Sequence, residues 1–495
     1  MTHVQIMAAA LLAGTMLLDA LVRPRAPRLR SITGLWLHTL AMLIGFGAVL
    51  ALCGNPAAAA LVMIGLMAAV VMGSNTKYAV LGEPLLFSDL ALVRAVFRHP
   101  QFYFTALSRV QIAALALGAL AVPAGIAMLF VAAPAPHLLG LGCLGGSMAA
   151  LAISLAVLRG SAIADRPDAA GDVARHGLIA ALLLYWRRWR ESIDPPPCTT
   201  PLPISTAAGL VVIVQCESFA DPADLFGDPA LGLPGLAAAR AAAWQSGALL
   251  VSGFGAYTMR TEYGVIFGRD ETALGFRQYD PYLTAIGEAS HALPARLAPS
   301  GWRSVFVHPH DMRFYGRGAI MPAAGFADLV GLERFAPPAA GAGRYVSDAA
   351  ITDAVLGIIA AADGPPPTPT LIHAVTIENH GPWPVDQLTS HRLDAGSISS
   401  AYLDLVRRGD AMLARLHAAM MARRKPAVLV FYGDHRPSIP GVTAPDGPRH
   451  TPYVMLRYGA DGQPLRGAGP PCDLTPAQLH HALIAMLLAR PPIAA

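Results

Sequence analysis

The stretch "AVLVFYGDHRPSIP", residues 427–440, joins an apolar run directly to an acid and an imidazole. Its first six residues are apolar, β-branched or aromatic, a pattern typical of a buried strand. Gly433, Asp434 and His435 follow at once, and charged groups are costly to bring near a core unless they have partners. We therefore expect this strand to end at the rim of a sheet, where Asp434 and His435 serve a site.

Strand-like and helix-like segments alternate on both sides of this stretch. The expected strands cover residues 210–216, 248–251, 303–307, 370–376, 427–432 and 453–456. The expected helices cover residues 235–244, 258–267, 348–361, 397–421 and 476–488. Continuous apolar strands that alternate with helices are typical of a largely parallel sheet covered on both faces. The pattern predicts an α/β domain over residues 208–495.

The N-terminal third differs in composition from the rest of the chain. The 495-residue chain is 54% hydrophobic and only 14% charged, which is unusual for a soluble enzyme. Apolar runs cover residues 5–22, 34–53, 57–73, 110–132 and 138–158, each near the roughly 17–25 residues that a membrane-spanning helix needs. We predict an α-helical membrane domain of about five spans over residues 1–158. The first run lacks the basic start and the cleavage site of a signal peptide.

Residues 159–207 form the expected connector, with an amphipathic part followed by the proline-rich "DPPPCTTPLP". A net charge of +4 is small for this length and indicates no nucleic-acid partner. Five cysteines give no disulfide framework, and Cys198 with Cys472 is the one conceivable bridge.

Ligands of parallel sheets bind beyond the carboxyl ends of the strands. Glu217 directly follows the expected strand 210–216, as Asp434 and His435 follow 427–432. Two carboxylates and an imidazole from separate strands can hold one divalent cation, with Mn²⁺ or Mg²⁺ favoured by oxygen ligands and Zn²⁺ also suited. The alternative for Asp434 and His435 alone is a pair of turn residues that cap neighbouring loops.

A candidate nucleophile lies in "SGFGAYTMRTEYGVIFG", residues 252–268. Gly253 and Gly255 allow a tight backbone path, and Thr258 then stands where a helical pattern begins. A hydroxyl at a helix N-terminus can bind a cation and can hold a phosphoryl group against free backbone N–H donors. The alternatives are that Thr258 is a plain N-cap residue and that Thr261 is the nucleophile.

Several ordered motifs together resemble the lipoteichoic acid synthase and phosphoglycerol transferase family, a branch of the alkaline phosphatase/sulfatase superfamily. The resemblance covers about residues 209–460, and five helices before an extracytoplasmic catalytic domain is also that family's layout. The motifs are "ESF" with Glu217, "TMRTEY" with Thr258, "FYGR" with Arg317, "ENHGPW" with His380, and "YGDH" with Asp434 and His435.

The resemblance implies a sulfatase-like fold and a metal-dependent phosphotransferase. Thr258 would attack phosphatidylglycerol, release diacylglycerol and hold glycerol phosphate as a covalent ester until an acceptor hydroxyl takes it. The acceptor would be a glycan of the cell envelope. One Mn²⁺-like ion would be bound by Glu217, Thr258, Asp434 and His435.

The resemblance also implies residues that contact the substrate. Tyr315 stands where the family has an aromatic residue beside the substrate arginine, which is Arg317 here. His380 matches a histidine that contacts the phosphoglycerol and handles a proton of the acceptor or leaving group. An arginine suits this role because its planar fork donates two parallel hydrogen bonds to a phosphate. Glu262 is expected to pair with Arg260 or Arg317.

His308, His310 and Asp311 in "HPHD" raise the question of a second metal site. We expect them instead to be hydrogen-bonding loop residues. Sulfate-ester hydrolysis is disfavoured, because no C/S-x-P-x-R segment surrounds Thr258. A phosphoethanolamine transferase is the nearest alternative, and "TMRTEY" with "FYGR" favours the phosphoglycerol branch.

The sequence gives two conflicting predictions for the side of the membrane on which the catalytic domain lies. The resemblance implies a multi-pass protein of the bacterial inner membrane with its catalytic domain on the periplasmic side. Arginines 23, 25, 28 and 30 after the first span indicate a cytoplasmic loop instead, and five spans would place the C-terminal domain on that side too. An extra membrane segment at 176–186 would place the C-terminal domain on the opposite side of the membrane, although this segment is short for a span. A non-catalytic membrane sensor that binds lipid head groups is the alternative from another class, and Asp19 is the one acid within a span.

Overall fold

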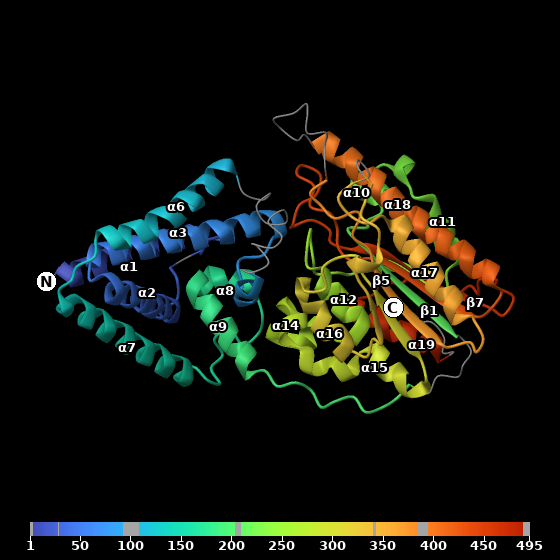
Figure 1. Cartoon of the computed structure of the whole chain (residues 1–495), viewed down its shortest axis with the longest axis horizontal. Coiled ribbons are helices and arrows are strands. Elements are labelled where there is room, and N and C mark those ends of the chain that lie inside the picture. Colours follow the sequence, from blue (N-terminus) through green and yellow to red (C-terminus); the bar gives the residue numbers. More distant parts are fainter. Residues whose placement is uncertain are drawn as a thin grey trace. The chain divides into compact units, whose positions relative to one another are not determined.

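The computed structural model describes residues 3–27, 29–92, 108–202, 209–339, 343–383 and 395–488. The chain forms two compact units, Met1–Ser192 and Ile193–Ala495, which we describe separately (Figure 1). The predicted domain boundary at residue 208 falls within residues 203–208, outside the described residues, and stays a prediction.

Among the described residues of the first unit, five helices are long and apolar enough to cross a membrane, which agrees with the predicted number and indicates a membrane protein. They are α1 (His3–Ala20), α2 (Ile32–Cys53), α3 (Pro56–Leu81), α6 (Arg109–Met128) and α7 (Pro134–Val157). Helix α3 runs on past the predicted end at residue 73. It ends at Gly82, whose φ of 72° and N–H bond to the Tyr78 carbonyl form a left-handed C-cap.

Small residues let α2 and α7 approach closely. A Cβ atom on Gly47 would lie 2.5 Å from the Leu144 nitrogen, and one on Gly140 would lie 2.4 Å from the Ala51 nitrogen. Helix pairs in lipid gain stability from such backbone contact, because apolar surface alone gives no drive to associate there.

The predicted extra segment at 176–186 forms part of a helical hairpin, α8 (Ala169–His176) and α9 (Leu178–Glu191). At 14 residues, α9 is too short to span. The Asp19 carboxylate is 2.8 Å from Arg30 and accepts a hydrogen bond from the Leu178 N–H at 2.9 Å. Arg30 also donates to the carbonyls of Val173 and Ala174. Asp19 of α1 therefore holds the start of α9, and Arg30 of the following loop holds α8.

The second unit is built on one seven-stranded sheet in the order β2-β7-β6-β1-β5-β3-β4. The strands are β1 (Leu210–Cys216), β2 (Gln245–Leu249), β3 (Arg303–Val307), β4 (Asp328–Val330), β5 (Thr370–Val375), β6 (Ala427–Gly433) and β7 (Thr451–Tyr458). Six strands run in one direction, whereas β7 runs antiparallel to its neighbours β6 and β2. The predicted, largely parallel sheet is confirmed. The three-residue strand β4 was not predicted, because so short a segment carries no periodic signal.

Alternate residues of the central strands pack on opposite faces, as the two-residue period of a strand requires. Val212 and Val214 of β1 join a core with α11 (Pro234–Ala242), α17 (Asp348–Ala362) and α18 (Ala395–Arg423). Val211 and Ile213 join a second core with α12 (Thr258–Phe267), α15 (Leu293–Leu297) and α19 (Pro476–Leu487). Both faces are covered, as predicted (Figure 1). The short helices are α10 (Pro222–Phe226), α13 (Glu271–Leu274), α14 (Pro281–Thr284) and α16 (Arg317–Ala323).

Candidate functional site

The two predicted acids come from neighbouring strands. β1 and β6 are parallel, and their register pairs Cys216 with Gly433, the last residue of each strand. Glu217 and Asp434 are therefore the first residues after the two strands. Gly433 allows the loops to close, because a Cβ atom there would lie 1.9 Å from the Phe219 carbonyl oxygen. Two residues far apart in the sequence thus emerge side by side at the carboxyl edge of the sheet.

Glu217, Asp434 and His435 converge on one point. His435 Nε2 lies 3.5 Å from Glu217 Oε1 and 3.4 Å from Asp434 Oδ2. One ligand atom of each residue falls within 4.8 Å of the others, and all three side chains are buried. Within the part of the chain that the structure describes, no other group of three or more such residues gathers in this way.

The three residues fit a divalent cation. Asp434 Oδ1 accepts hydrogen bonds from the Ser218 and His435 N–H groups, whereas Oδ2 is buried without a hydrogen-bond partner among the described residues. His435 Nδ1 lies 3.1 Å from the Arg436 carbonyl and so carries the proton, which turns the Nε2 lone pair toward the carboxylates. Burial, and then the nearby Asp434 charge, raises the pKa of Glu217 to about 8. A cation would relieve this concentration of negative charge.

Thr258 is the first residue of α12, and the segment around it is bonded to the Asp434 loop on both sides. The Gly255 N–H donates to the Arg436 carbonyl at 2.9 Å, and the Thr261 hydroxyl donates to the Asp434 carbonyl at 2.8 Å. Thr258 lies between these two anchors. The hydroxyl of Thr261 is engaged in holding the loop.

The start of α12 has no side-chain cap. Tyr257, with a φ of 75°, occupies the N-cap position, so Thr258 is not the capping residue that the alternative interpretation supposed. N–H groups in the first turn of a helix lack intrahelical acceptors and favour a negative ligand. The ten-residue helix therefore presents its N-terminal end, with the Thr258 hydroxyl, on a segment fastened to the three-residue cluster.

Arg317 is buried and held by Glu262. Its Nη2 lies 2.7 Å from Glu262 Oε2 and its Nε lies 3.2 Å from Oε1, a two-pronged ion pair. Glu262 is one turn after Thr258 on α12, so the same helix carries Thr258 and orients the arginine. The Arg317 charge also acts to lower the pKa of Glu217, although burial and Asp434 outweigh it. Of the two partners expected for Glu262, Arg317 is the one observed.

Tyr315 and His380 lie beside these groups. The Arg317 guanidinium carbon is 5.4 Å from the centre of the Tyr315 ring, which suits a cation–π contact. His380 follows β5, the other neighbour of β1, and its Nδ1 lies 2.6 Å from the Gly381 carbonyl. Burial lowers the pKa of His380, while the Asp434 charge acts to raise it. A neutral imidazole at the same sheet edge is able to accept a proton.

A family model described as "Sulfatase" matches residues 210–484, more than half of the chain. The chain belongs to the sulfatase family. The match runs from β1 to α19 and confirms the predicted place in the alkaline phosphatase/sulfatase superfamily.

The chain is also similar to two proteins of Rhizobium meliloti (strain 1021). One is the capsular polysaccharide biosynthesis protein RkpI, 27% identical over 407 residues that cover 77% of this chain and 74% of that protein. The other is named for the modification of cyclic β-1,2-glucan, and is 26% identical over 268 residues that cover 52% of this chain and 40% of that protein. Among solved structures, phosphoglycerol transferase GacH of Streptococcus pyogenes has a TM-score of 0.45 at 17% identity, covering 61% of this chain and 79% of that chain.

Among the residues that the structure describes, none joins the "HPHD" segment of this sulfatase-family chain into a cluster of metal ligands. Asp311 binds Arg313 at 2.9 Å. His308 Nδ1 lies 3.1 Å from the Val375 carbonyl, and its Nε2 lies 3.4 Å from Arg317 Nη1. The prediction of hydrogen-bonding loop residues is consistent with these contacts.

Sequence reasoning missed that His308 contacts Arg317 at Nη1, the guanidinium nitrogen that Glu262 does not bind. Burial and the Arg317 charge hold the pKa of His308 well below its usual range, so it is a neutral acceptor for the guanidinium. The signal in the sequence was its position directly after β3, which is two strands from β1 in the sheet.

We expect a divalent cation to stabilise the wild type and to reverse the stability order of an Asp434→Asn variant. In EDTA the variant should melt no lower than wild type, because one of two adjacent buried carboxylates is gone. A bound ion at about 100 times its Kd adds about 2.7 kcal/mol to wild type, and much less where a ligand is lost. Differential scanning fluorimetry with MnCl₂, MgCl₂ or ZnCl₂ measures this.

Asp353→Asn is the matched control, because Asp353 is exposed on α17 and pairs only with Arg415 among the described residues. It should respond to the cations as wild type does. Equal stabilisation of wild type and Asp434→Asn by every cation would contradict a metal site at this cluster.

Proposed function

We propose that the protein is a membrane-anchored phosphoglycerol transferase, which moves glycerol phosphate from phosphatidylglycerol to a hydroxyl of a cell-envelope glycan. The observation that carries this proposal is the convergence of Glu217, Asp434 and His435, together with a helix start that is bonded to their loop on both sides of Thr258. In this proposal the protein lies in a bacterial inner membrane and its catalytic unit faces the periplasm.

The reaction has two displacements at phosphorus. In the first, the Thr258 oxygen bonds to the phosphorus, the bond to the diacylglycerol oxygen breaks, Thr258 gives up its proton and diacylglycerol takes one. In the second, the acceptor oxygen bonds to the same phosphorus, the bond to Thr258 breaks, the acceptor hydroxyl loses its proton and Thr258 regains one. One divalent cation, Mn²⁺ by preference and otherwise Mg²⁺ or Zn²⁺, would lower the pKa of the Thr258 hydroxyl and offset charge on the phosphoryl oxygens when bound.

Protein side chains supply the remaining parts of this chemistry. Arg317, oriented by Glu262 and flanked by Tyr315, places a fixed positive charge for the phosphoryl oxygens. His380 is neutral, because burial lowers its pKa, and can take the proton of the attacking hydroxyl. Phosphoryl transfer depends on alignment and charge stabilisation, and these residues are already held by hydrogen bonds.

The acceptor class draws support from the relatives. One is named for capsular polysaccharide biosynthesis and the other for cyclic β-1,2-glucan modification, and both processes concern glycans. The donor class draws support from the motifs of Thr258 and Arg317, which resemble the phosphoglycerol branch.

Purified wild type should release diacylglycerol from vesicles of phosphatidylglycerol, and EDTA should lower the rate by about 10²-fold or more, since a cation supplies several kcal/mol of charge stabilisation. The measurement uses phosphatidylglycerol labelled in its acyl chains. Vesicles of phosphatidylethanolamine are the control donor. Release from phosphatidylethanolamine alone would point to a phosphoethanolamine transferase, and release from neither lipid would contradict an enzyme of this kind.

A further inference from the structure

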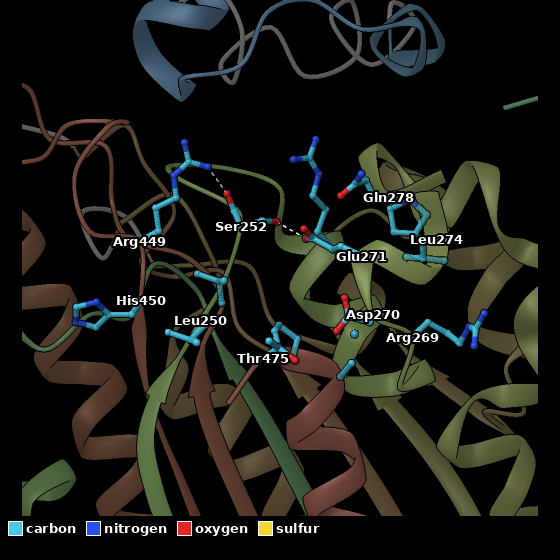
Figure 2. A pocket seen from close by; sticks show the side chains of 16 residues that line it. Leu250, Ser252, Arg269, Asp270, Glu271, Leu274, Gln278, Arg449, His450 and Thr475 are labelled. Carbon is cyan, nitrogen blue, oxygen red and sulfur yellow. Dashed lines mark hydrogen bonds between the residues drawn. The ribbon is translucent and has the colours of Figure 1, made fainter. Parts of the chain in front are cut away.

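A cavity of about 400 Å³ lies beside α12 and is distinct from the three-residue cluster (Figure 2). Its volume falls in the roughly 300–1,000 Å³ range of small-molecule sites. Figure 2 shows Arg449 on one side of the cavity and Asp270 and Gln278 on the other, with Leu250 between them. Nothing in the reaction described above uses these residues.

The cavity shares a wall with the proposed reaction centre. Arg260, two residues after Thr258 on α12, is part of its lining, and so is Ser252. The residue after Ser252 is Gly253, where a Cβ atom would lie 3.6 Å from the His435 Cβ atom. One short segment of chain therefore separates the cavity from the candidate metal ligands.

The lining combines donors, acceptors and apolar surface. Arg449 and Gln278 can donate hydrogen bonds, Asp270 and Glu271 can accept them, and Leu250 adds an apolar face that is 49% exposed. A sugar ring has neighbouring hydroxyls that both donate and accept, together with apolar C–H faces. A lining of this mixed kind suits such a ligand.

The polar groups are held in place before any ligand arrives. Arg449 donates to the carbonyls of Ser252 and Pro445, and no carboxylate of the described residues forms an ion pair with it. The Ser252 hydroxyl donates to Glu271. Fixed groups lose little entropy on binding, which favours recognition over non-specific contact.

We propose that this cavity is an acceptor subsite, which binds a sugar unit of the glycan so that a hydroxyl of a neighbouring unit reaches the phosphorus on Thr258. The assignment rests on the proposed function and names where its acceptor binds. The cavity and Thr258 share α12, so a ligand in the cavity lies against the helix that carries the covalent ester.

Two variants and two acceptors test this subsite. Leu250→Trp is chosen to fill the cavity, and Arg449→Gln removes one of its charged donors. The probes are a β-1,2-linked glucose oligomer, which the proposal requires to occupy the subsite, and free glycerol, which carries no sugar unit to occupy it. For each variant, the ratio of transfer to the oligomer over transfer to glycerol should fall by about 10-fold or more, mainly through KM of the oligomer. Direct binding of the oligomer by calorimetry should weaken in parallel.

Leu332→Trp and Arg415→Gln are matched controls at exposed sites away from the cavity, and their ratios should equal that of wild type. The subsite is overturned if the ratio stays constant in both cavity variants. It is also overturned if wild type releases diacylglycerol with glycerol present but neither binds nor modifies the oligomer, and in that case the proposed function still stands. If wild type releases no diacylglycerol under any condition, the proposed function itself is refuted. In that case the binding measurement still tests the subsite, which is refuted if the cavity variants bind the oligomer as tightly as wild type does.

Discussion

Thr258→Ala is expected to abolish diacylglycerol release from phosphatidylglycerol, with a loss on the order of 10³-fold or more. The physical reason is that the reaction loses the oxygen that bonds to phosphorus, while the Thr261 hydroxyl is engaged with the Asp434 carbonyl and cannot replace it. Mass spectrometry of wild type incubated with phosphatidylglycerol and no acceptor should find glycerol phosphate on the peptide that contains Thr258. The variant should carry none.

Two matched variants control for structural effects. Thr258→Ser keeps a hydroxyl at the start of α12 and should retain part of the activity and the adduct. Thr368→Ala removes an exposed threonine hydroxyl outside the site and should behave as wild type. An adduct on another residue, or equal rates for wild type and Thr258→Ala, would contradict the covalent route.

Glu262→Gln is expected to destabilise the protein by about 3–5 kcal/mol, because it leaves the Arg317 charge buried without a compensating partner. The side chain of Glu262 is fully buried and that of Arg317 is 2% exposed, so water cannot take over the role of the carboxylate. His308 is a neutral acceptor and offsets only part of the loss. Thermal melting of the full-length protein, followed by tryptophan fluorescence, should show a lower Tm for the variant.

A double variant separates stability from chemistry at this pair. Replacing both residues, as Glu262→Leu with Arg317→Met, removes the buried charges together and should recover much of the lost stability. Diacylglycerol release should stay low, since no guanidinium remains for the phosphoryl group. Glu333→Gln, at an exposed position, serves as the control. Full activity of the double variant would contradict the proposed role of Arg317, and an unchanged Tm in Glu262→Gln would contradict the importance of the buried pair.

Several features could be predicted from the sequence because each depends on local pattern. The five apolar runs have the length of a bilayer crossing, and the structure has five such helices. Apolar strands followed directly by Glu217 and by Asp434 placed both acids at one edge of the sheet, because parallel strands end at the same edge. The start of α12 at Thr258 followed from the glycines before it and the helical period after it.

Other features were decided by pairing between distant segments, which no local pattern encodes. β7 turns antiparallel, three-residue β4 joins the edge, and folding brings Glu262 of α12 to Arg317 at the start of α16. The cavity beside α12 also arises only when segments from residues 250, 270 and 449 meet. Periodicity and strand ends are properties of consecutive residues, whereas register, charge partners and cavities depend on which surfaces come into contact after the chain has folded. The sequence by itself therefore determined the membrane helices and the acids at the sheet edge, and the tertiary structure decided their partners.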